Sequence, residues 1–222
     1  MSKKINVSII GVTGYTGLEL LRVLINHPNV NLKYLLSQSH AGEKISDVWP
    51  HLKNICDMKI NEADLQEVAS KSDLVFLALP NNEAQKIVPS IIGKTKIIDL
   101  SGDFRLQSSL AYEKYYEHVH EYKEGINQFV YGLSELNGEQ ISEAQNIANP
   151  GCFATAIQLA LLPLADKKLL NDEVHVSAVT GSTGAGQSLS ATSHFTWRNN
   201  NISIYKAFEH QHLAEITQSL KQ

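Results

Sequence analysis

The sequence has little of several features that mark particular classes of protein. It holds only two cysteines among 222 residues, Cys56 and Cys152, so at most one disulfide could form. The 19 lysines and arginines are scattered and are outnumbered by 23 aspartates and glutamates, which leaves no basic surface for nucleic acid. No apolar stretch reaches the ~20 residues that span a bilayer, and Met1–Lys4 lead into a core strand rather than a signal sequence. We therefore expect a cytoplasmic protein without a nucleic-acid or membrane partner.

Apolar residues, by contrast, are plentiful and regularly placed. They make up 43% of the chain, enough for the core of one large domain or about two small ones. Strand-like runs at 5–10, 32–36, 74–79 and 96–100 alternate with helical patterns such as 82–92. This alternation predicts an α/β fold, in which a parallel sheet is covered by helices and ligands bind at the carboxyl ends of the strands.

A glycine-rich turn follows the first expected strand directly. Gly11, Gly14 and Gly17 have the spacing G-x-x-G-x-x-G, and a helical pattern begins at Leu18. Strand, glycine turn and helix in this order are typical of dinucleotide binding, with the phosphates at the helix N-terminus. The alternative is a merely structural turn. We expect the following residues to bind the cofactor: Gly11, Thr13, Gly14, Tyr15, Thr16 and Gly17.

The loop after the second expected strand indicates which cofactor binds. An enzyme that uses NAD places an acidic residue there, against the adenosine ribose. This chain instead has Ser37, Gln38 and Ser39, followed by His40, so no carboxylate would repel a 2′-phosphate. The loop favours NADP over NAD, although it could also be an ordinary polar loop. Pro80, after the third expected strand, should lie near the nicotinamide.

One cysteine lies at the expected start of a helix. Pro150 and Gly151 form a turn before Cys152, and the apolar residues after it have helical spacing up to Pro163, where we expect the helix to end. The backbone N–H groups and dipole of a first helical turn favour a thiolate, which is a nucleophile. Alternatively Cys152 is a small buried hydrophobic residue, the role that we assign to Cys56.

The remainder of the chain adds a glycine-rich loop and two histidines. An expected strand at 174–179 precedes a loop at 180–187 that is rich in backbone N–H groups, suited to a phosphate or an oxyanion, unless it is a flexible linker. His210 and His212 cannot share one face of a helix if 205–220 is helical, so only one of them would face the site. His118 and His120 resemble a metal pair, but we interpret them as solvated surface and expect no metal.

Several motifs in the same order make the chain resemble the N-acetyl-γ-glutamyl-phosphate reductase family, NADPH-dependent enzymes of arginine biosynthesis that are related to aspartate-semialdehyde dehydrogenase. They are the glycine turn, 99–105 (DLSGDFR), 131–136 (YGLSEL), 149–152 (NPGC), 181–186 (GSTGAG) and 210–212 (HQH). The resemblance implies a Rossmann-type NADP-binding domain, which we place at 1–148. It also implies an α+β substrate and dimerisation domain at 149–222, and a homo-oligomer such as a dimer or tetramer.

The same resemblance implies roles for individual residues. Cys152 would be the nucleophile, and His210 or His212 the acid/base, with His210 preferred. From its position five residues after His210, we take Glu215 as an orienting partner of that histidine, with a substrate-positioning role as the alternative. Gly184 and Ala185 would contact the cofactor. As substrate-binding candidates we take Ser101, Arg105, Asn149, Ser182 and Glu215. The implied reaction is reduction of N-acetyl-γ-glutamyl phosphate to its semialdehyde and phosphate through a cysteine thioester.

Two features depart from the family pattern, and two alternative functions stay open. Asn81 and Asn82 stand where the family often has histidine and glycine, and family members extend well beyond Gln222, so we expect an incomplete second domain. One alternative is reduction of a related acyl phosphate: N-succinylglutamyl, aminoadipyl or aspartyl phosphate. The other is a non-catalytic dinucleotide-binding fragment.

Overall fold

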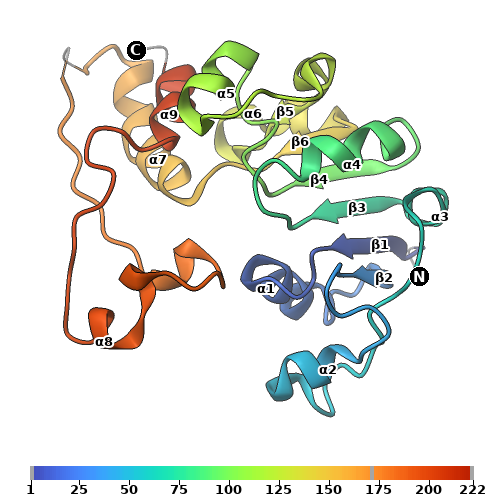
Figure 1. Cartoon of the computed structure of the whole chain (residues 1–222). Helices are drawn as coiled ribbons and strands as arrows, with labels where there is room; N and C mark the ends of the chain where they lie inside the picture. Colours follow the sequence, from blue (N-terminus) through green and yellow to red (C-terminus); the bar gives the residue numbers. More distant parts are fainter. Residues whose placement is uncertain (1–2, 171–172, 221–222) are drawn as a thin grey trace.

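The computed structural model describes residues 3–170 and 173–220 and is built around one six-stranded sheet (Figure 1). Every adjacent pair of strands is parallel. In spatial order the strands are β2 (Val30–Leu36), β1 (Ile5–Ile10), β3 (Leu74–Leu77), β4 (Lys96–Asp99), β6 (Asn146–Ala148) and β5 (Val130–Tyr131). The predicted α/β fold is confirmed, although the two short strands β5 and β6 were not predicted.

Helices cover both faces of this sheet. The helices of the described residues are α1 (Tyr15–Leu24), α2 (Ile45–Val48), α3 (Leu65–Lys71), α4 (Ala84–Ile91), α5 (Ser109–Tyr116), α6 (Ser134–Glu143), α7 (Cys152–Asp166), α8 (Phe195–Arg198), which lies away from the sheet (Figure 1), and α9 (His212–Leu220). Val7 and Ile9 of β1 pack with α1 and with Cys56, which is buried. Ile10 lies in a second cluster with α3 and α4. Alternate residues of a strand point to opposite faces, so a strand buried on both faces is a continuous apolar run.

Helix α7 differs in two ways from its predicted form. It does not end at Pro163 but continues to Asp166, with the proline inside it. Although proline removes one backbone hydrogen bond, the last turn packs against α9, where Leu161, Leu162 and Ala165 contact Ile216 and Leu220. The expected buried face is also only partly covered, because Leu159 is 39% exposed.

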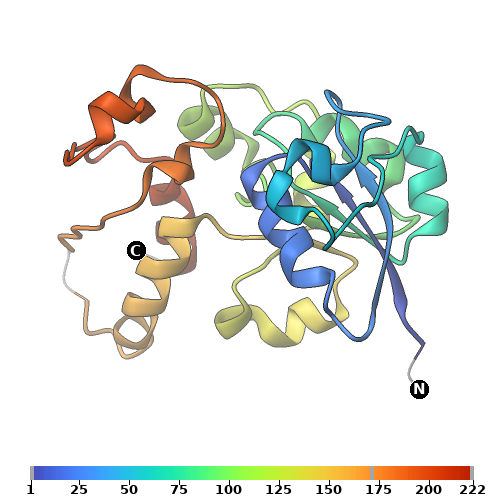
Figure 2. The same ribbon diagram turned by 90° about the horizontal axis from the view of Figure 1, so that it is seen from below.

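The segment between α7 and α9 contains no strand in its described part, residues 173–211. The strand expected at 174–179 is wrong: these residues are exposed and lack regular structure. A strand requires a neighbour for its backbone N–H and C=O groups, and no described segment pairs with this one. The segment runs out past α8 and returns to α9 along one side of the molecule (Figure 2).

Two predictions about histidines also need correction. Residues 205–211 are not helical, so His210 precedes α9 and His212 begins it. His120 is not on a solvated surface but is 1% exposed, three residues after Glu117, which ends α5 with a left-handed φ of 59°. Its Nε2 bonds the carbonyl of Asp103 at 2.9 Å, and its ring packs on Phe104 and Tyr112. In the part of the chain that the structure describes, no helix is long and apolar enough to cross a membrane.

Candidate active site

The parallel sheet brings the predicted site residues to one edge. The glycine turn follows β1, Ser37 follows β2, Pro80 lies three residues after β3, Ser101 follows β4, and Asn149 follows β6. Because all strands are parallel, all of these loops lie at the carboxyl edge, where α/β proteins bind their ligands.

Two of the three glycines in the turn have no room for a side chain. Gly11 has a φ of +92°, and an added Cβ would lie 2.2 Å from the carbonyl oxygen of Ala78. At Gly17, an added Cβ would lie 2.2 Å from the carbonyl oxygen of Gly11, which shows how closely α1 packs on the turn. Gly14 is different, since a Cβ there would meet nothing closer than 3.6 Å. Within the protein itself, a side chain would therefore fit at Gly14 with ordinary van der Waals contacts.

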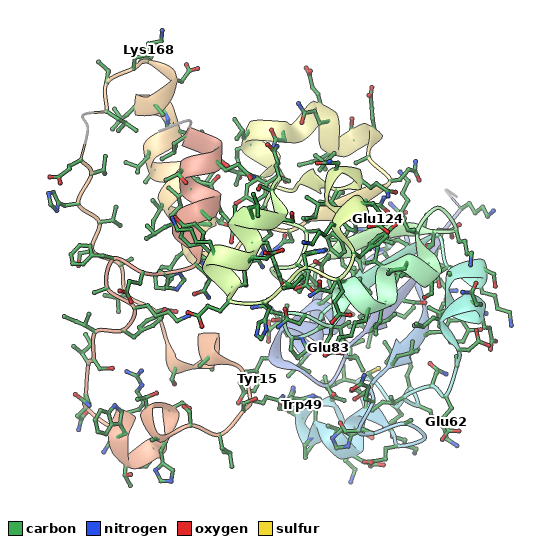
Figure 3. The ribbon with its side chains drawn as sticks, turned by 45° about the horizontal axis from the view of Figure 1, so that its top comes forward. Tyr15, Trp49, Glu62, Glu83, Glu124 and Lys168 are labelled. Atoms are coloured by element: carbon green, nitrogen blue, oxygen red, sulfur yellow. The ribbon has the colours of Figure 1, made fainter. Side chains whose placement is uncertain are left out.

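Hydroxyl groups connect this turn to the loop after β2. The hydroxyl oxygens of Thr13 and Ser37 are 2.8 Å apart, and that of Ser39 lies 3.5 Å from Ser37. Gln187 donates from Nε2 to the carbonyl of Thr13 at 2.8 Å, so the loop containing Ser182, Gly184 and Ala185 reaches the turn. Tyr15 lies beside Trp49, with ring centroids 6.0 Å apart (Figure 3).

The loop after β3 accommodates its unusual asparagines. Asn82 has a φ of 72°, a conformation that glycine adopts most easily and asparagine better than most other residues. Its Oδ1 accepts from Tyr112 Oη at 2.7 Å, and its N–H donates to Asp103. Asn81 Oδ1 accepts the N–H of Gly102 at 2.8 Å. This departure from the family pattern therefore preserves an ordered loop.

The residues after β4 are buried rather than open to a ligand. Ser101 is 3% exposed and bonds the carboxylate of Asp99, whose pKa burial raises to about 7. Arg105 donates to the carbonyls of Asn149 and Leu100 and to Glu215, with N···O distances of 2.8, 2.9 and 3.2 Å. These bonds hold the loop after β4 against the start of α7, and they leave Arg105 little freedom to reach a substrate.

Cys152 is an exposed free thiol at the first position of α7. Histidines lie next to it: the ring of His210 is 5.4 Å from that of Phe153, and the two histidine rings are 4.5 Å apart. An added Cβ at Gly151 would lie 2.3 Å from Nε2 of His212, so only glycine fits before the cysteine. The structure thus brings Cys152 and the two histidines together at the carboxyl edge.

The two histidines have different surroundings. His210 is partly exposed, and its Nδ1 accepts the backbone N–H of His212 at 3.1 Å, so the neutral ring carries its proton on Nε2. Burial, together with Lys206, lowers its pKa. His212 is 8% exposed, and burial, aided by Arg105, His210 and Lys206, lowers its pKa to about 3. His212 is therefore neutral at physiological pH.

Glu215 does not pair with His210. Among the described residues its only histidine contact is with His212, whose Nε2 lies 3.8 Å from its Oε1. Its side chain is completely buried and bonded to Arg105, Tyr131 and Gly151, which leaves no open side for a substrate. The sequence analysis did not identify Tyr131 and Gln158 as members of this cluster, although Tyr131 lies in the motif at 131–136.

The buried neutral state of His212 should make stability depend on pH. Its pKa is about 3 in the folded protein against an ordinary value of 6.5, so the unfolded state binds the proton more tightly. The contribution of His212 to stability is present above pH 6.5 and is lost as the pH falls toward 3. The difference in unfolding free energy between the parent and His212→Asn should therefore shrink on acidification, as measured by urea unfolding. A difference that grows would contradict this assignment.

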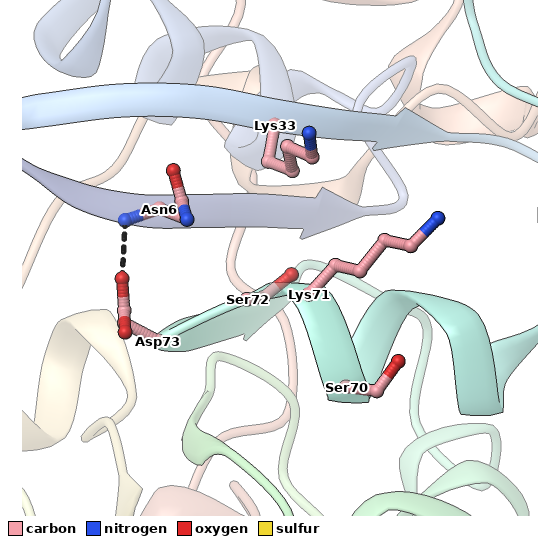
Figure 4. Close-up of a pocket in the computed structure, with 6 residues that line it drawn as sticks. All are labelled: Asn6, Lys33, Ser70, Lys71, Ser72 and Asp73. Carbon is pink, nitrogen blue, oxygen red and sulfur yellow. Dashed lines mark hydrogen bonds between the residues drawn. The ribbon is translucent and has the colours of Figure 1, made fainter.

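A second hollow lies far from this site. It is lined by Asn6, Lys33, Ser70, Lys71, Ser72 and Asp73 (Figure 4). Asn6 is near the start of β1 and Asp73 directly precedes β3, so this hollow is at the amino edge of the sheet. Lys71 already pairs with Glu67 at 2.8 Å.

Comparison with known families agrees with this geometry. Residues 6–144 match the profile of the semialdehyde dehydrogenase NAD-binding domain, and residues 152–222 match that of the semialdehyde dehydrogenase dimerisation domain. The chain belongs to the semialdehyde dehydrogenase family. In this member, the glycine turn lies in the first matched region, and Cys152, His210 and His212 lie in the second.

Individual relatives refine this assignment. The chain is 51% identical over 219 residues to an N-acetyl-gamma-glutamyl-phosphate reductase from Azobacteroides pseudotrichonymphae, covering 97% of this chain and 63% of the relative. It is 49% identical to that of Christiangramia forsetii, covering 98% and 62%. This semialdehyde dehydrogenase family member thus spans about three fifths of the length of these relatives. The resemblance inferred from the motifs is confirmed.

Solved structures share the fold at low sequence identity. Aspartate semialdehyde dehydrogenase II from Vibrio cholerae superimposes with a TM-score of 0.53 at 20% identity, covering 84% of this chain and 49% of that one. The enzyme from Candida albicans, solved with NADP, gives 0.52 at 17% identity, covering 76% and 48%. Both similarities concern the fold alone.

Proposed function

We propose that the protein reduces N-acetyl-γ-glutamyl phosphate with NADPH and yields N-acetylglutamate semialdehyde and phosphate. The observation that carries this proposal is the position of Cys152, exposed at the start of α7 beside His210 and at the same edge as the glycine turn. The names of relatives that are about half identical to this chain support the choice of substrate.

The residues around the glycine turn fit a dinucleotide phosphate. Gly14 directly precedes the N-terminus of α1, where backbone N–H groups favour a phosphate. Thr13 and Ser37 place two hydroxyl groups there without a carboxylate, which suits a 2′-phosphate. Gly184 and Ala185 lie on the loop that Gln187 ties to Thr13.

The proposed reaction uses Cys152 as the nucleophile and His210 as the proton donor. The Cys152 thiolate attacks the carbonyl carbon of the acyl phosphate, a C–S bond forms, and phosphate leaves with the electrons of the C–O bond. Bound NADPH supplies the hydride that reduces the thioester. Nε2 of His210 donates a hydrogen bond to the oxygen that gains negative charge. When the ring is protonated, Nε2 also transfers a proton to that oxygen. The hydroxyl proton then returns to Nε2 of His210 as the C=O bond forms and the C–S bond breaks, which releases the aldehyde and regenerates the thiolate.

The function is tested with a panel of acyl phosphates and purified protein. We expect NADPH oxidation, followed by absorbance at 340 nm, to be fastest with N-acetyl-γ-glutamyl phosphate and slower with N-succinylglutamyl, aminoadipyl and aspartyl phosphates. A faster rate with another member would assign that substrate instead. NADPH binding without turnover of any member would favour a non-catalytic dinucleotide-binding role.

The choice of cofactor is tested at Ser37. Replacing Ser37 by aspartate should weaken NADPH binding by about tenfold, because a carboxylate would repel the 2′-phosphate, while NADH binding changes little. Ser70→Asp is a matched control, since Ser70 is exposed at the opposite edge of the sheet. The measurement is the KM for each cofactor, and equal KM values for NADH and NADPH in the parent would refute the assignment.

Two further features complete the proposal. The exposed apolar side chains between α7 and α9, including Val179, Leu189, Phe195, Ile204 and Phe208, support a homo-oligomer built through the region that matches a dimerisation domain.

The boundary between an NADP-binding unit and a catalytic unit is proposed at residue 148, where β6 ends. The cytoplasm is the proposed compartment, and Cys56 and Cys152 are both free thiols.

A further inference from the structure

A buried chain of polar side chains ends at the backbone just before the nucleophile. Glu215 of α9 accepts two hydrogen bonds at Oε2, one from the Tyr131 hydroxyl and one from the N–H of Gly151, both at 2.9 Å. Its other oxygen accepts from Arg105 at 3.2 Å. The Glu215 side chain is completely buried, so protein groups must replace all of the water that a carboxylate would otherwise bind.

Gln158 fixes the direction of the Tyr131 hydroxyl. Gln158 is completely buried on α7, six residues after Cys152, and its Nε2 donates to the Tyr131 oxygen at 2.8 Å. Because the tyrosine oxygen accepts this bond, its own proton is free to point to Glu215. The order of donation is therefore Gln158 to Tyr131 to Glu215.

This arrangement places a carboxylate and a thiol at the start of one helix. Cys152 is the first residue of α7, and the carboxylate of Glu215 is bonded to the preceding residue, Gly151. A carboxylate at this position would disfavour the thiolate unless other donors neutralised and held it. Arg105 supplies the charge, and Tyr131 supplies the remaining donor on the oxygen that faces Gly151.

We propose that Tyr131, oriented by Gln158, is a positioning residue for the nucleophile: it holds the Glu215 carboxylate on the N–H of Gly151 and so sets the start of α7 and the reactivity of Cys152. The inference rests on the proposed function for its effect on turnover. Its effect on the thiol itself is independent of any substrate.

The test is Tyr131→Phe, which removes only the hydroxyl. We expect kcat for acyl phosphate reduction to fall about tenfold, with KM for both substrates within about twofold, because geometry at the nucleophile changes while the binding surfaces do not. Alkylation of Cys152 by iodoacetamide at pH 7, followed by mass spectrometry, should slow about threefold. Tyr34→Phe is a matched control, since Tyr34 also donates to a carboxylate, that of Glu67 at 2.8 Å, but on β2.

A second variant separates positioning from stability. Tyr131→Phe leaves the amide of Gln158 buried without its partner, and adding Gln158→Leu removes that unpaired amide, which should restore most of the lost unfolding free energy. In the double variant we expect the slow alkylation and low kcat to persist. Their return to parental values, or unchanged alkylation in Tyr131→Phe, would overturn the proposal. If the parent reduces no acyl phosphate, the proposed function fails, whereas the alkylation rates still decide the role of Tyr131.

Discussion

Replacing Cys152 by serine should reduce acyl phosphate turnover at least about 10³-fold, because a serine hydroxyl remains protonated where a thiol ionises. NADPH binding should persist, since the glycine turn and Ser37 belong to the loops after β1 and β2 and do not contain the cysteine. The measurements are NADPH oxidation for turnover and the change in cofactor fluorescence for binding. Loss of turnover with retained binding assigns Cys152 to the chemistry.

Cys56→Ser is the matched control for this experiment. Cys56 is 4% exposed in the hydrophobic cluster on the α1 side of the sheet, so a serine there should leave turnover near the parental value. The buried hydroxyl should nevertheless lower the unfolding free energy by about 1–3 kcal/mol. Parental turnover by Cys152→Ser would exclude a thioester mechanism.

The sequence predicted the elements that depend on local pattern. The strands of residues 5–10 and 96–99 contain apolar residues that are buried in the parallel sheet, among them Ile9 and Ile97. The glycine turn was recognisable from its spacing, and Gly17 is constrained by the carbonyl oxygen of Gly11 within the turn itself. Cys152 could be placed at a helix start because Pro150 and Gly151 precede it. In each case the physical cause lies within a few residues of its effect.

Elements that depend on distant partners could not be predicted in this way. Residues 174–179 have the alternation of a strand, but no described segment pairs with them. Strands β5 and β6 have only two and three residues, too few to show a period, and they exist because they pair with each other and with β4. The contacts of Glu215 join it to residues 110, 84 and 64 positions away in the sequence. No spacing rule links such positions, so the role of Glu215 could be inferred only from its burial and contacts in the structure.

Local structure around the histidines also changes the reason for choosing between them. The sequence argument was conditional: if 205–220 formed one helix, His210 and His212 would face different directions. In the structure His210 precedes α9, and the choice depends on burial instead. His212 is held between Gly151 and Glu215 with a pKa of about 3, so it does not take up a proton near neutral pH. His210 is partly exposed and presents Nε2–H beside the first turn of α7.

We therefore expect His210→Asn to lower kcat about 10²-fold, the contribution typical of a positioned acid or base. Alkylation of Cys152 should continue, because the thiol and the start of α7 are unchanged. His194→Asn is a matched control: its Nδ1 also accepts the N–H two residues ahead, that of Thr196 at 3.4 Å, but at the start of α8. His212→Asn should retain most of the turnover while its stability changes with pH as described above. If His212→Asn lost turnover while His210→Asn kept the parental turnover, the assignment would be reversed. Parental turnover in both variants would remove histidine from the mechanism.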